Sequence, residues 1–319
     1  MTEVFVTLDN IKDAHERIRS VVARTPLHHA DALEEELGGE IRLKLESLQR
    51  TGSFKIRGAY NFVAQMSESE RAKGLITYSS GNHAQAVALA AHLHGVRAVV
   101  VMPVTATDVK IKGSVGLGAE VILEGTTSLD RKVMAESIAE AEGLSIVPPF
   151  DHMDIIAGQG TVGIEIAEDW GALDTVLLPI GGGGLCGGSA AALRRLKPEV
   201  TILGVEPVGA ASMLSALNSG EPVTIENIDS IADGLLPVRA GNHTFRHVRE
   251  FVDDVIVVND QDIKEAVTFL FAWQKLVVEY SGAVTVAALR SGNLDTRGRK
   301  TVAVISGGNI DPAIIASME

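Results

Sequence analysis

Short, almost wholly apolar runs alternate with stretches of helical periodicity along this chain, and this alternation is what most constrains the fold. The runs at 75–78, 98–102, 175–180, 201–205 and 301–305 have the length of strands, and many of their residues are β-branched. Strands that are apolar on both faces need cover on both faces, which a mostly parallel sheet flanked by helices provides. The sequence therefore predicts an α/β protein.

The length of 319 residues predicts about two domains. Further strands are expected at 41–45, 120–123, 145–147 and 255–258. Helices are expected at 8–22, 54–66, 82–94, 108–117 and 128–142. Because 74–146 contains strands and helices of its own, we assign it to a small substrate-side domain. It is inserted into a large cofactor-binding domain of 1–73 and 147–319, and both domains are expected to be doubly wound.

Composition excludes several classes of partner. The net charge of −13 argues against nucleic acid and against an anionic membrane surface. No apolar run approaches the ~18 residues of a membrane span, and no signal peptide is evident. The one cysteine, Cys186, excludes an intrachain disulfide and fits a reducing compartment. We expect a cytoplasmic protein that acts on a small molecule.

Three loops rich in Gly, Ser and Asn follow predicted strands, at 79–83, 181–185 and 306–309. Ligands of open α/β sheets bind beyond the carboxyl ends of the strands, so these loops should meet. The run Gly181, Gly182, Gly183 and Gly184 enters a helix near Leu185, where N–H groups can cradle a phosphate. Lys55 adds an amine near the start of a predicted helix. An amine with a phosphate cradle favours pyridoxal phosphate (PLP), which carries an aldehyde and a phosphate.

A second interpretation of the glycine run remains open. Gly182, Gly184 and Gly187 match the dinucleotide fingerprint G-x-G-x-x-G, and Glu206 follows the next strand, where an acidic ribose ligand belongs. A nicotinamide-dependent oxidoreductase would satisfy this spacing. It would give no role to Lys55 or to the loops at 79–83 and 306–309.

Six segments, in order over nearly the whole chain, resemble the fold-type II PLP enzymes. They are Leu-Gln-Arg-Thr-Gly-Ser-Phe-Lys-Ile-Arg-Gly-Ala-Tyr-Asn at 48–61, Ser-Ser-Gly-Asn-His-Ala-Gln at 79–85, Ala-Gly-Gln-Gly-Thr at 157–161, the glycine run at 181–185, Ile-Ala-Asp-Gly-Leu at 231–235, and Ser-Gly-Gly-Asn at 306–309. Within these enzymes the chain looks like the branch of threonine dehydratase, serine racemase and 3-hydroxyaspartate dehydratase. The resemblance implies a tryptophan synthase β-like fold and a homodimer or higher homo-oligomer.

The resemblance also implies roles for individual residues. Lys55 would form the Schiff base with PLP and, once freed, take the Cα proton of the substrate. The other residues would contact the cofactor or the substrate carboxylate. Cofactor contacts would come from Phe54, Asn82, Gly181, Gly182, Gly183, Gly184, Leu185 and Ser306. Carboxylate contacts would come from Ser79, Ser80 and His83.

Three positions distinguish members of this branch. Ser80 matches the racemase base on the opposite face of the ring, which makes racemase activity a hypothesis. Glu206 matches the first ligand of the racemase cation site, but Ser212 replaces the aspartate, so we expect no tight Mg²⁺ or Ca²⁺ site. A monovalent ion stays open. Arg131 lies where relatives place a substrate-facing arginine that could grip a second carboxylate, although a solvated surface arginine is the default interpretation.

The expected function is therefore PLP-dependent dehydration of a β-hydroxy-α-amino acid, giving a keto acid and ammonia. Threonine or serine competes with 3-hydroxyaspartate as the substrate. A serine racemase-like enzyme, an NAD-dependent oxidoreductase and a non-catalytic PLP-binding protein remain alternatives. The sequence leaves open the preferred stereoisomer, the pathway, the ion and the size of the oligomer.

Overall fold

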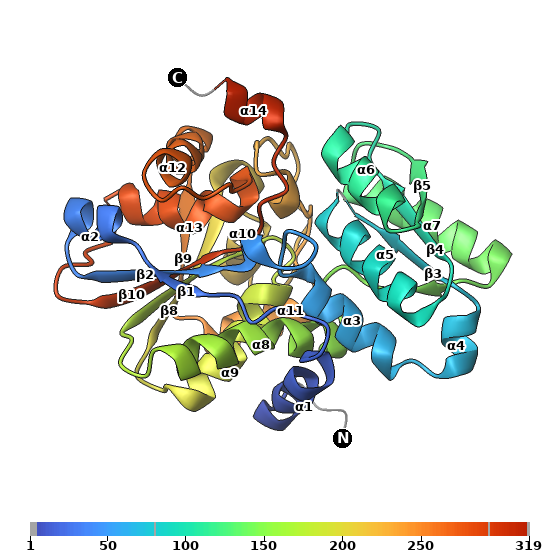
Figure 1. The fold of residues 1–319 in the computed structure, drawn as a ribbon, viewed down its shortest axis with the longest axis horizontal. Coiled ribbons are helices and arrows are strands. Elements are labelled where there is room, and N and C mark those ends of the chain that lie inside the picture. Colours follow the sequence, from blue (N-terminus) through green and yellow to red (C-terminus); the bar gives the residue numbers. More distant parts are fainter. Residues whose placement is uncertain (1–4, 80, 293, 318–319) are drawn as a thin grey trace.

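The computed structural model describes residues 5–79, 81–292 and 294–317, which form two lobes, each built on its own sheet (Figure 1). The larger sheet runs in the order β1-β2-β10-β7-β8-β9 and the smaller in the order β5-β4-β3-β6. Strands of the larger sheet are β1 (Leu27–His29), β2 (Glu40–Leu45), β7 (Thr175–Pro179), β8 (Thr201–Pro207), β9 (Asp254–Val258) and β10 (Lys300–Ile305). Those of the smaller sheet are β3 (Leu75–Tyr78), β4 (Ala98–Met102), β5 (Glu120–Leu123) and β6 (Ser145–Ile146).

The larger sheet is mostly parallel, and apolar side chains cover both of its faces. Among the named strands of this sheet in the described residues, β1 alone pairs antiparallel, with β2. Side chains along a strand point alternately to opposite faces, so Val176 and Leu178 enter one core while Leu177 enters the other. The first core is covered by α1 (Leu8–Ile18), α8 (Met153–Asp169), α9 (Gly184–Leu196), α10 (Ser212–Ser219) and α11 (Asn242–Phe251). The second is covered by α2 (Asp31–Leu37), α12 (Asp260–Ala272), α13 (Tyr280–Arg290) and α14 (Pro312–Ala316).

The smaller sheet is covered in the same way. On one face lie α5 (Asn82–His94) and α6 (Asp108–Gly116), and on the other lies α7 (Ser128–Glu142). The helix α3 (Lys55–Gln65) packs against α5 and also against α8 of the large lobe, and α4 (Glu68–Ala72) follows it. Lys55 therefore stands where the two lobes join. Short 3₁₀ turns η1 (Glu46–Leu48), η2 (Val208–Ala210) and η3 (Asp233–Leu235) complete the elements.

The predicted α/β class with mostly parallel sheets is confirmed. Two local details differ from the prediction. The helix α1 ends at Ile18, before the predicted end at residue 22, and β1 is an antiparallel edge strand that no apolar run in the sequence indicated. All four strands of the smaller sheet fall within 74–146, while α3 packs on that lobe from outside this range. The assignment of 74–146 as an inserted domain stays our proposal.

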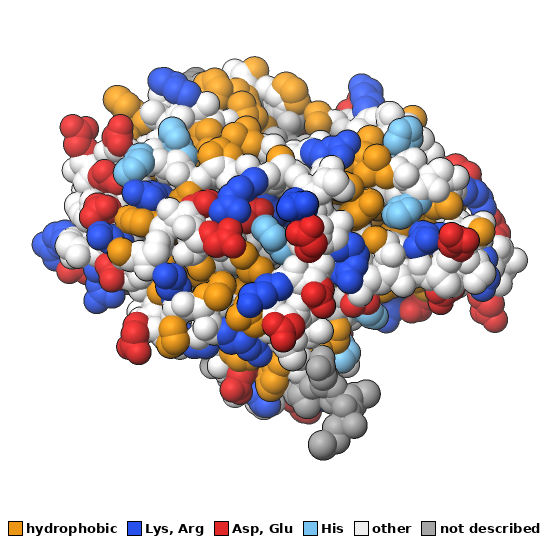
Figure 2. Space-filling model, turned by 60° about the horizontal axis from the view of Figure 1, so that its bottom comes forward, with side chains coloured by type: hydrophobic (Ala, Val, Ile, Leu, Met, Phe, Trp, Pro, Cys, Tyr) orange, Lys and Arg blue, Asp and Glu red, His pale blue; other side chains and the backbone are white. Residues whose placement is uncertain are grey.

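The surface of the molecule carries charges of both signs. On the face shown in Figure 2, basic and acidic side chains are interspersed. None of the helices in the described residues is both long enough and apolar enough to cross a bilayer.

Candidate active site

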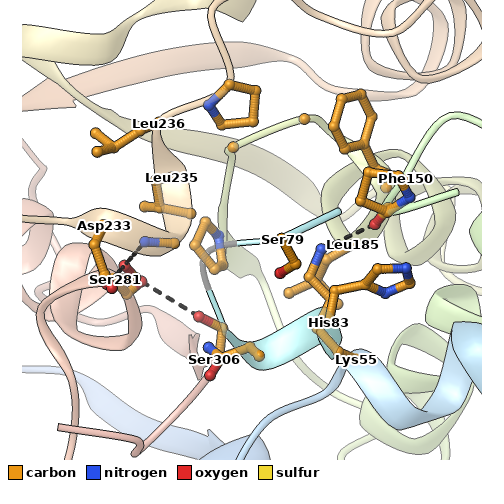
Figure 3. Close-up of a pocket in the computed structure, with 18 of the residues that line it drawn as sticks. Lys55, Ser79, His83, Phe150, Leu185, Asp233, Leu235, Leu236, Ser281 and Ser306 are labelled. Atoms are coloured by element: carbon orange, nitrogen blue, oxygen red, sulfur yellow. Dashed lines mark hydrogen bonds between the residues drawn. The ribbon is translucent and has the colours of Figure 1, made fainter. Parts of the chain in front are cut away.

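One pocket gathers the predicted site residues from both lobes (Figure 3). Its walls come from the start of α3, the carboxyl ends of β3, β7 and β10, and the loop at 149–150. Lining residues that the sequence predicted are Phe54, Lys55, Ser79, Asn82, His83, Arg131, Gly181, Gly182, Gly183, Gly184, Leu185 and Ser306. The predicted racemase base, Ser80, lies outside the described residues. The strand order thus brings together residues as far apart as Phe54 and Ser306, which are 252 positions apart in the sequence, as their shared position at strand ends predicts.

Lys55 is the first residue of α3, and its amine points into the pocket (Figure 3). Its Nζ donates to the Pro149 carbonyl at 3.0 Å and lies 5.3 Å from the ring centre of Phe54. Burial lowers the pKa of Lys55 to about 8, and the carboxylate of Glu279 opposes this shift. A much larger fraction of this amine is therefore uncharged near neutral pH than in a solvated lysine. An uncharged amine is the form that attacks an aldehyde.

Buried ion pairs fix the start of α3. Arg57, which is fully buried, forms ion pairs with Glu46 at 2.8 Å and with Glu165 of α8 at 2.7 Å. Lys44 of β2 also contacts Glu165, at 2.6 Å. Two buried cations thus face two buried anions, a balance that such burial requires. Because Arg57 is two residues after Lys55, this network holds the reactive amine in register with the large lobe.

The glycine run forms a tight connection between β7 and α9. Gly183 has φ of +91°, which favours glycine, and a Cβ on Gly182 would lie 2.3 Å from the ring of Phe150. The first N–H groups of α9 have no acceptor within the helix and face the same pocket as Lys55. The backbone at this helix start packs so closely that Gly182 has no room for a side chain. A helix start with bare backbone N–H groups suits a phosphate. The predicted cradle for the PLP phosphate therefore fits the chain.

Ser306 and His83 make contacts that limit their roles. Ser306 is buried after β10, and its hydroxyl donates to the Ser281 carbonyl at 3.3 Å, so its oxygen lone pairs can still accept. The His83 ring is also buried, and Nε2 lies 3.2 Å from the Val147 carbonyl. Burial lowers the pKa of His83 to about 3, so the ring is neutral and must donate from Nε2. The bare Nδ1 can only accept, which suits a carboxylate poorly, whereas the backbone N–H of His83 can donate to one.

Arg131 is not a surface residue, so the default interpretation of its sequence position is wrong. Its side chain is only 7% exposed and lines the pocket from α7. Nη1 donates to the Thr126 carbonyl at 3.2 Å, and buried Nε has no hydrogen-bond partner among the described residues. Burial lowers the pKa of Arg131, and the nearby Asp130 opposes this. A buried guanidinium with unused donors is suited to an anionic group in the pocket.

Glu206 lies outside the pocket, and its carboxylate caps the start of α10. Both carboxylate oxygens accept backbone N–H groups at the start of α10, from Met213 at 2.9 Å and from Leu214 at 2.8 Å. Burial raises the pKa of Glu206 to about 7, against the effect of these hydrogen bonds. The Ser212 hydroxyl is buried without a partner among the described residues. A carboxylate engaged in this way supports neither a ribose contact nor a strong cation ligand.

Several pocket residues carry charge or shape that the sequence reasoning did not assign. They are Tyr78, Pro149, Phe150, Asp233, Leu236, Pro237, Glu279 and Ser281. Asp233 lies in the Ile-Ala-Asp-Gly-Leu segment that carried the resemblance, and Glu279 with Ser281 stands at the start of an apolar helix. A charged residue directly before an apolar helix was a signal that could have identified Glu279.

The fold and this pocket define a PLP-dependent enzyme of fold type II, because a lysine amine, a glycine-lined helix start and the Ser306 that follows β10 line one pocket. The match to the family of pyridoxal-phosphate dependent enzymes spans residues 18–307. The chain belongs to this family, and the predicted cofactor is confirmed.

Relatives and solved structures agree with this placement. The chain is 45% identical over 310 residues to the L-threonine ammonia-lyase of Thermotoga maritima, covering 97% of this chain and 77% of the relative. It is 40% identical over 305 residues to the L-threo-3-hydroxyaspartate ammonia-lyase of Saccharomyces cerevisiae, covering 96% and 94%. Maize serine racemase superposes with a TM-score of 0.93 at 35% identity, over 98% of this chain and 96% of that one. The predicted branch of the family is confirmed, and the dinucleotide interpretation of the glycine run is set aside.

Proposed function

We propose that this chain is a PLP-dependent dehydratase (ammonia-lyase) of β-hydroxy-α-amino acids, either threonine and serine or 3-hydroxyaspartate. The observation that carries this proposal is the Lys55 amine, with its pKa lowered to about 8, in one pocket with the glycine cradle and Ser306. Ammonia-lyases among the relatives support the reaction class.

Some residues of the pocket would bind the cofactor, and Lys55 would transfer a proton. Gly181, Gly182, Gly183, Gly184 and Leu185 would bind the phosphate through backbone N–H groups, with Phe54, Asn82 and Ser306 around the ring. When bound, PLP supplies a sink for the electrons left on the substrate Cα. Lys55 Nζ, freed from the cofactor, would take the Cα proton. Loss of the Cβ hydroxyl and hydrolysis then give a keto acid and ammonia.

Substrate recognition would use the loop after β3 and Arg131. Ser79 and the backbone of His83 lie at the start of α5, where N–H groups favour a carboxylate. Arg131 lines the same pocket with unused donors, so a second carboxylate on Cβ would find a partner there. This favours 3-hydroxyaspartate, whose β-carbon carries a carboxylate, over threonine, whose β-carbon carries a methyl group.

The test is ammonia release from L-threonine, L-serine and each stereoisomer of 3-hydroxyaspartate, measured side by side with PLP present. Preference for one isomer of 3-hydroxyaspartate supports the role of Arg131. Fastest turnover of threonine would show that Arg131 has a structural role and does not recognise the substrate. No release from any of these substrates contradicts the lyase proposal and leaves the PLP site intact.

Racemase activity is the second candidate, because the chain also resembles serine racemases in sequence and in structure. It depends on Ser80, which lies outside the described residues. Formation of D-serine during long incubation with L-serine would support it, and an L-serine sample that stays free of the D-isomer would remove it.

We also propose a homodimer in the cytoplasm. Large apolar side chains of the large lobe stay exposed, among them Leu48 at 56%, Trp273 at 69% and Val277 at 50%. A Cβ on Gly308 would contact both Ser47 and the Val277 carbonyl, so the segments that carry Leu48 and Val277 lie side by side. Such apolar exposure fits an interface with a second copy. Light scattering should give twice the chain mass, and a monomer that persists at high concentration would refute the dimer.

The proposed location in the cytoplasm is supported by the single cysteine, Cys186, which is buried and free. A chain with one unpaired cysteine suits a reducing compartment.

A further inference from the structure

The side chain of Asn82 is held from both sides by residues of the large lobe. Its Nδ2 donates to Glu279 Oε1, and its Oδ1 accepts from Asn309 Nδ2 at 2.9 Å. These two partners fix which end of the amide is the nitrogen, because a carboxylate accepts and an NH₂ group donates. Nδ2 carries a second hydrogen, and no acceptor among the described residues takes it. Asn82 lines the pocket, so this hydrogen is available to a ligand.

Glu279 is buried, and its charge is paired with that of Lys110. It is 2% exposed, and its Oε2 lies 3.2 Å from Lys110 Nζ, which is itself buried. Lys110 also forms an ion pair with Asp233. Although burial opposes it, the carboxylates of Glu279 and Asp233 raise the pKa of Lys110, so this lysine stays charged. Burial in turn raises the pKa of Glu279, and Lys110 counteracts that shift.

This ion cluster joins the two lobes across the pocket. Lys110 belongs to α6 of the small lobe, whereas Asp233 and Glu279 belong to η3 and the start of α13. The lysine chain lies against the loop that leads into Asn82, since a Cβ on Gly81 would come within 2.3 Å of Lys110 Cδ. One salt-bridged group therefore contacts both the loop that carries Asn82 and the carboxylate that orients its amide.

We propose that Glu279 is a positioning residue for the cofactor, which holds the Asn82 amide with its free N–H toward the PLP ring, while Lys110 keeps Glu279 in place across the lobes. This rests on the proposed contact between Asn82 and PLP. A purely structural ion pair would affect stability alone. The positioning role requires that Glu279 act through Asn82, which makes the two residues energetically coupled with respect to cofactor binding.

The test compares Asn82→Ala, Glu279→Gln and the double variant, with Lys112→Met as the matched control. Lys112 is two residues from Lys110 on the same helix, but its ion pair with Asp108 is exposed, at 78% for both side chains. Glutamine at 279 can accept from Asn82 only by turning its NH₂ toward the Lys110 ammonium, so the amide loses its fixed partner. Each apoprotein is titrated with PLP, and the visible absorption and circular dichroism bands of the bound cofactor are recorded.

Each single variant should weaken PLP binding about tenfold, as expected for loss of one hydrogen bond to a charged group. The double variant should bind no more weakly than Asn82→Ala, and Glu279→Gln should shift the dichroism band. Lys112→Met should match the parent protein. Normal PLP binding by Glu279→Gln, or strictly multiplied effects in the double variant, would overturn the proposal.

Two further results keep the test decisive. Should Glu279→Gln fail to fold by far-ultraviolet dichroism, Lys110→Met takes its place, with Lys110→Arg expected to restore binding; lack of rescue would count against the role of Lys110. If Asn82→Ala binds PLP normally, the Asn82 contact itself is refuted, and the positioning role with it. Neither outcome depends on turnover, so a failed dehydratase assay would be recognised separately.

Discussion

Lys55 lies in the first turn of α3, where burial in the pocket wall lowers the pKa of its amine. The carboxylate of Glu279 partly offsets this by stabilising the charged amine. The pKa of about 8 leaves about a tenth of the amine uncharged at pH 7. The same burial that would be unfavourable for a structural lysine thus prepares a nucleophile. At this scale, reactivity follows from the surroundings of one nitrogen atom.

The rate at which the apoprotein binds PLP covalently should therefore rise about tenfold from pH 7 to pH 9 and then level off, since the uncharged fraction saturates above the pKa. Stopped-flow absorbance measures this rate. A rise that continues steeply beyond pH 9 would indicate an unperturbed lysine. Borohydride reduction of the complex should label the peptide that contains Lys55, and Lys55→Ala should remove the label.

Arg131 is the second residue whose surroundings decide its role. Arg131→Ala should lower kcat/KM for 3-hydroxyaspartate by about 10- to 100-fold, the loss expected for a hydrogen bond between charged groups, with a much smaller effect on threonine. Arg131→Lys serves as the control, because it keeps the charge and loses the two-pronged geometry. An unchanged ratio of activities on the two substrates would show that Arg131 has no part in recognition.

At the scale of elements, the connection between β7 and α9 depends on glycine for close approach. Gly182→Ala places a Cβ against the Phe150 ring, so the backbone or the ring must shift, and we expect a loss of about 1–3 kcal/mol in stability together with weaker PLP binding. Gly116→Ala in α6 is the matched control. A Cβ there meets nothing within 4 Å, and because Gly116 is the last residue of α6, alanine should stabilise the helix by less than the ~0.5–1 kcal/mol of a mid-helix glycine. Urea unfolding and PLP titration measure both, and equal behaviour of the two variants would contradict the argument.

Elements and their order were predictable from sequence because apolar runs and glycine loops act locally. Residues 75–78 form β3 within the predicted bounds, and the loops after β3, β7 and β10 meet because parallel strands end at one edge. Interactions across the fold were not predictable in this way. The burial of Arg131 depends on how α7 packs on the small sheet, and the use of Glu206 depends on the start of α10. The ion cluster of Lys110 and Glu279 joins residues 169 positions apart, and no local pattern indicates that pairing.

At the scale of the whole molecule, the buried charges of Arg57 join the lobe junction to the large sheet. Arg57→Met should destabilise the protein by about 3–5 kcal/mol, because Glu46 and Glu165 would be left with one buried cation between them. Arg97→Met is the control, since Arg97 forms its ion pairs with Glu120 and Glu142 at the surface, and we expect a far smaller change. Urea midpoints of both apoproteins decide the matter, and similar midpoints would show that the buried network contributes little.

The strand order also has a consequence for synthesis on the ribosome. β10 lies in the interior of the large sheet, between β2 and β7, although it comes after the sheet's other strands along the described chain. The small sheet has all its strands once residue 146 has emerged, but the large one stays divided until residue 305 follows. Ser306 comes directly after that strand, so the nascent chain can fold its small lobe early, yet it cannot complete the cofactor pocket until this strand has inserted.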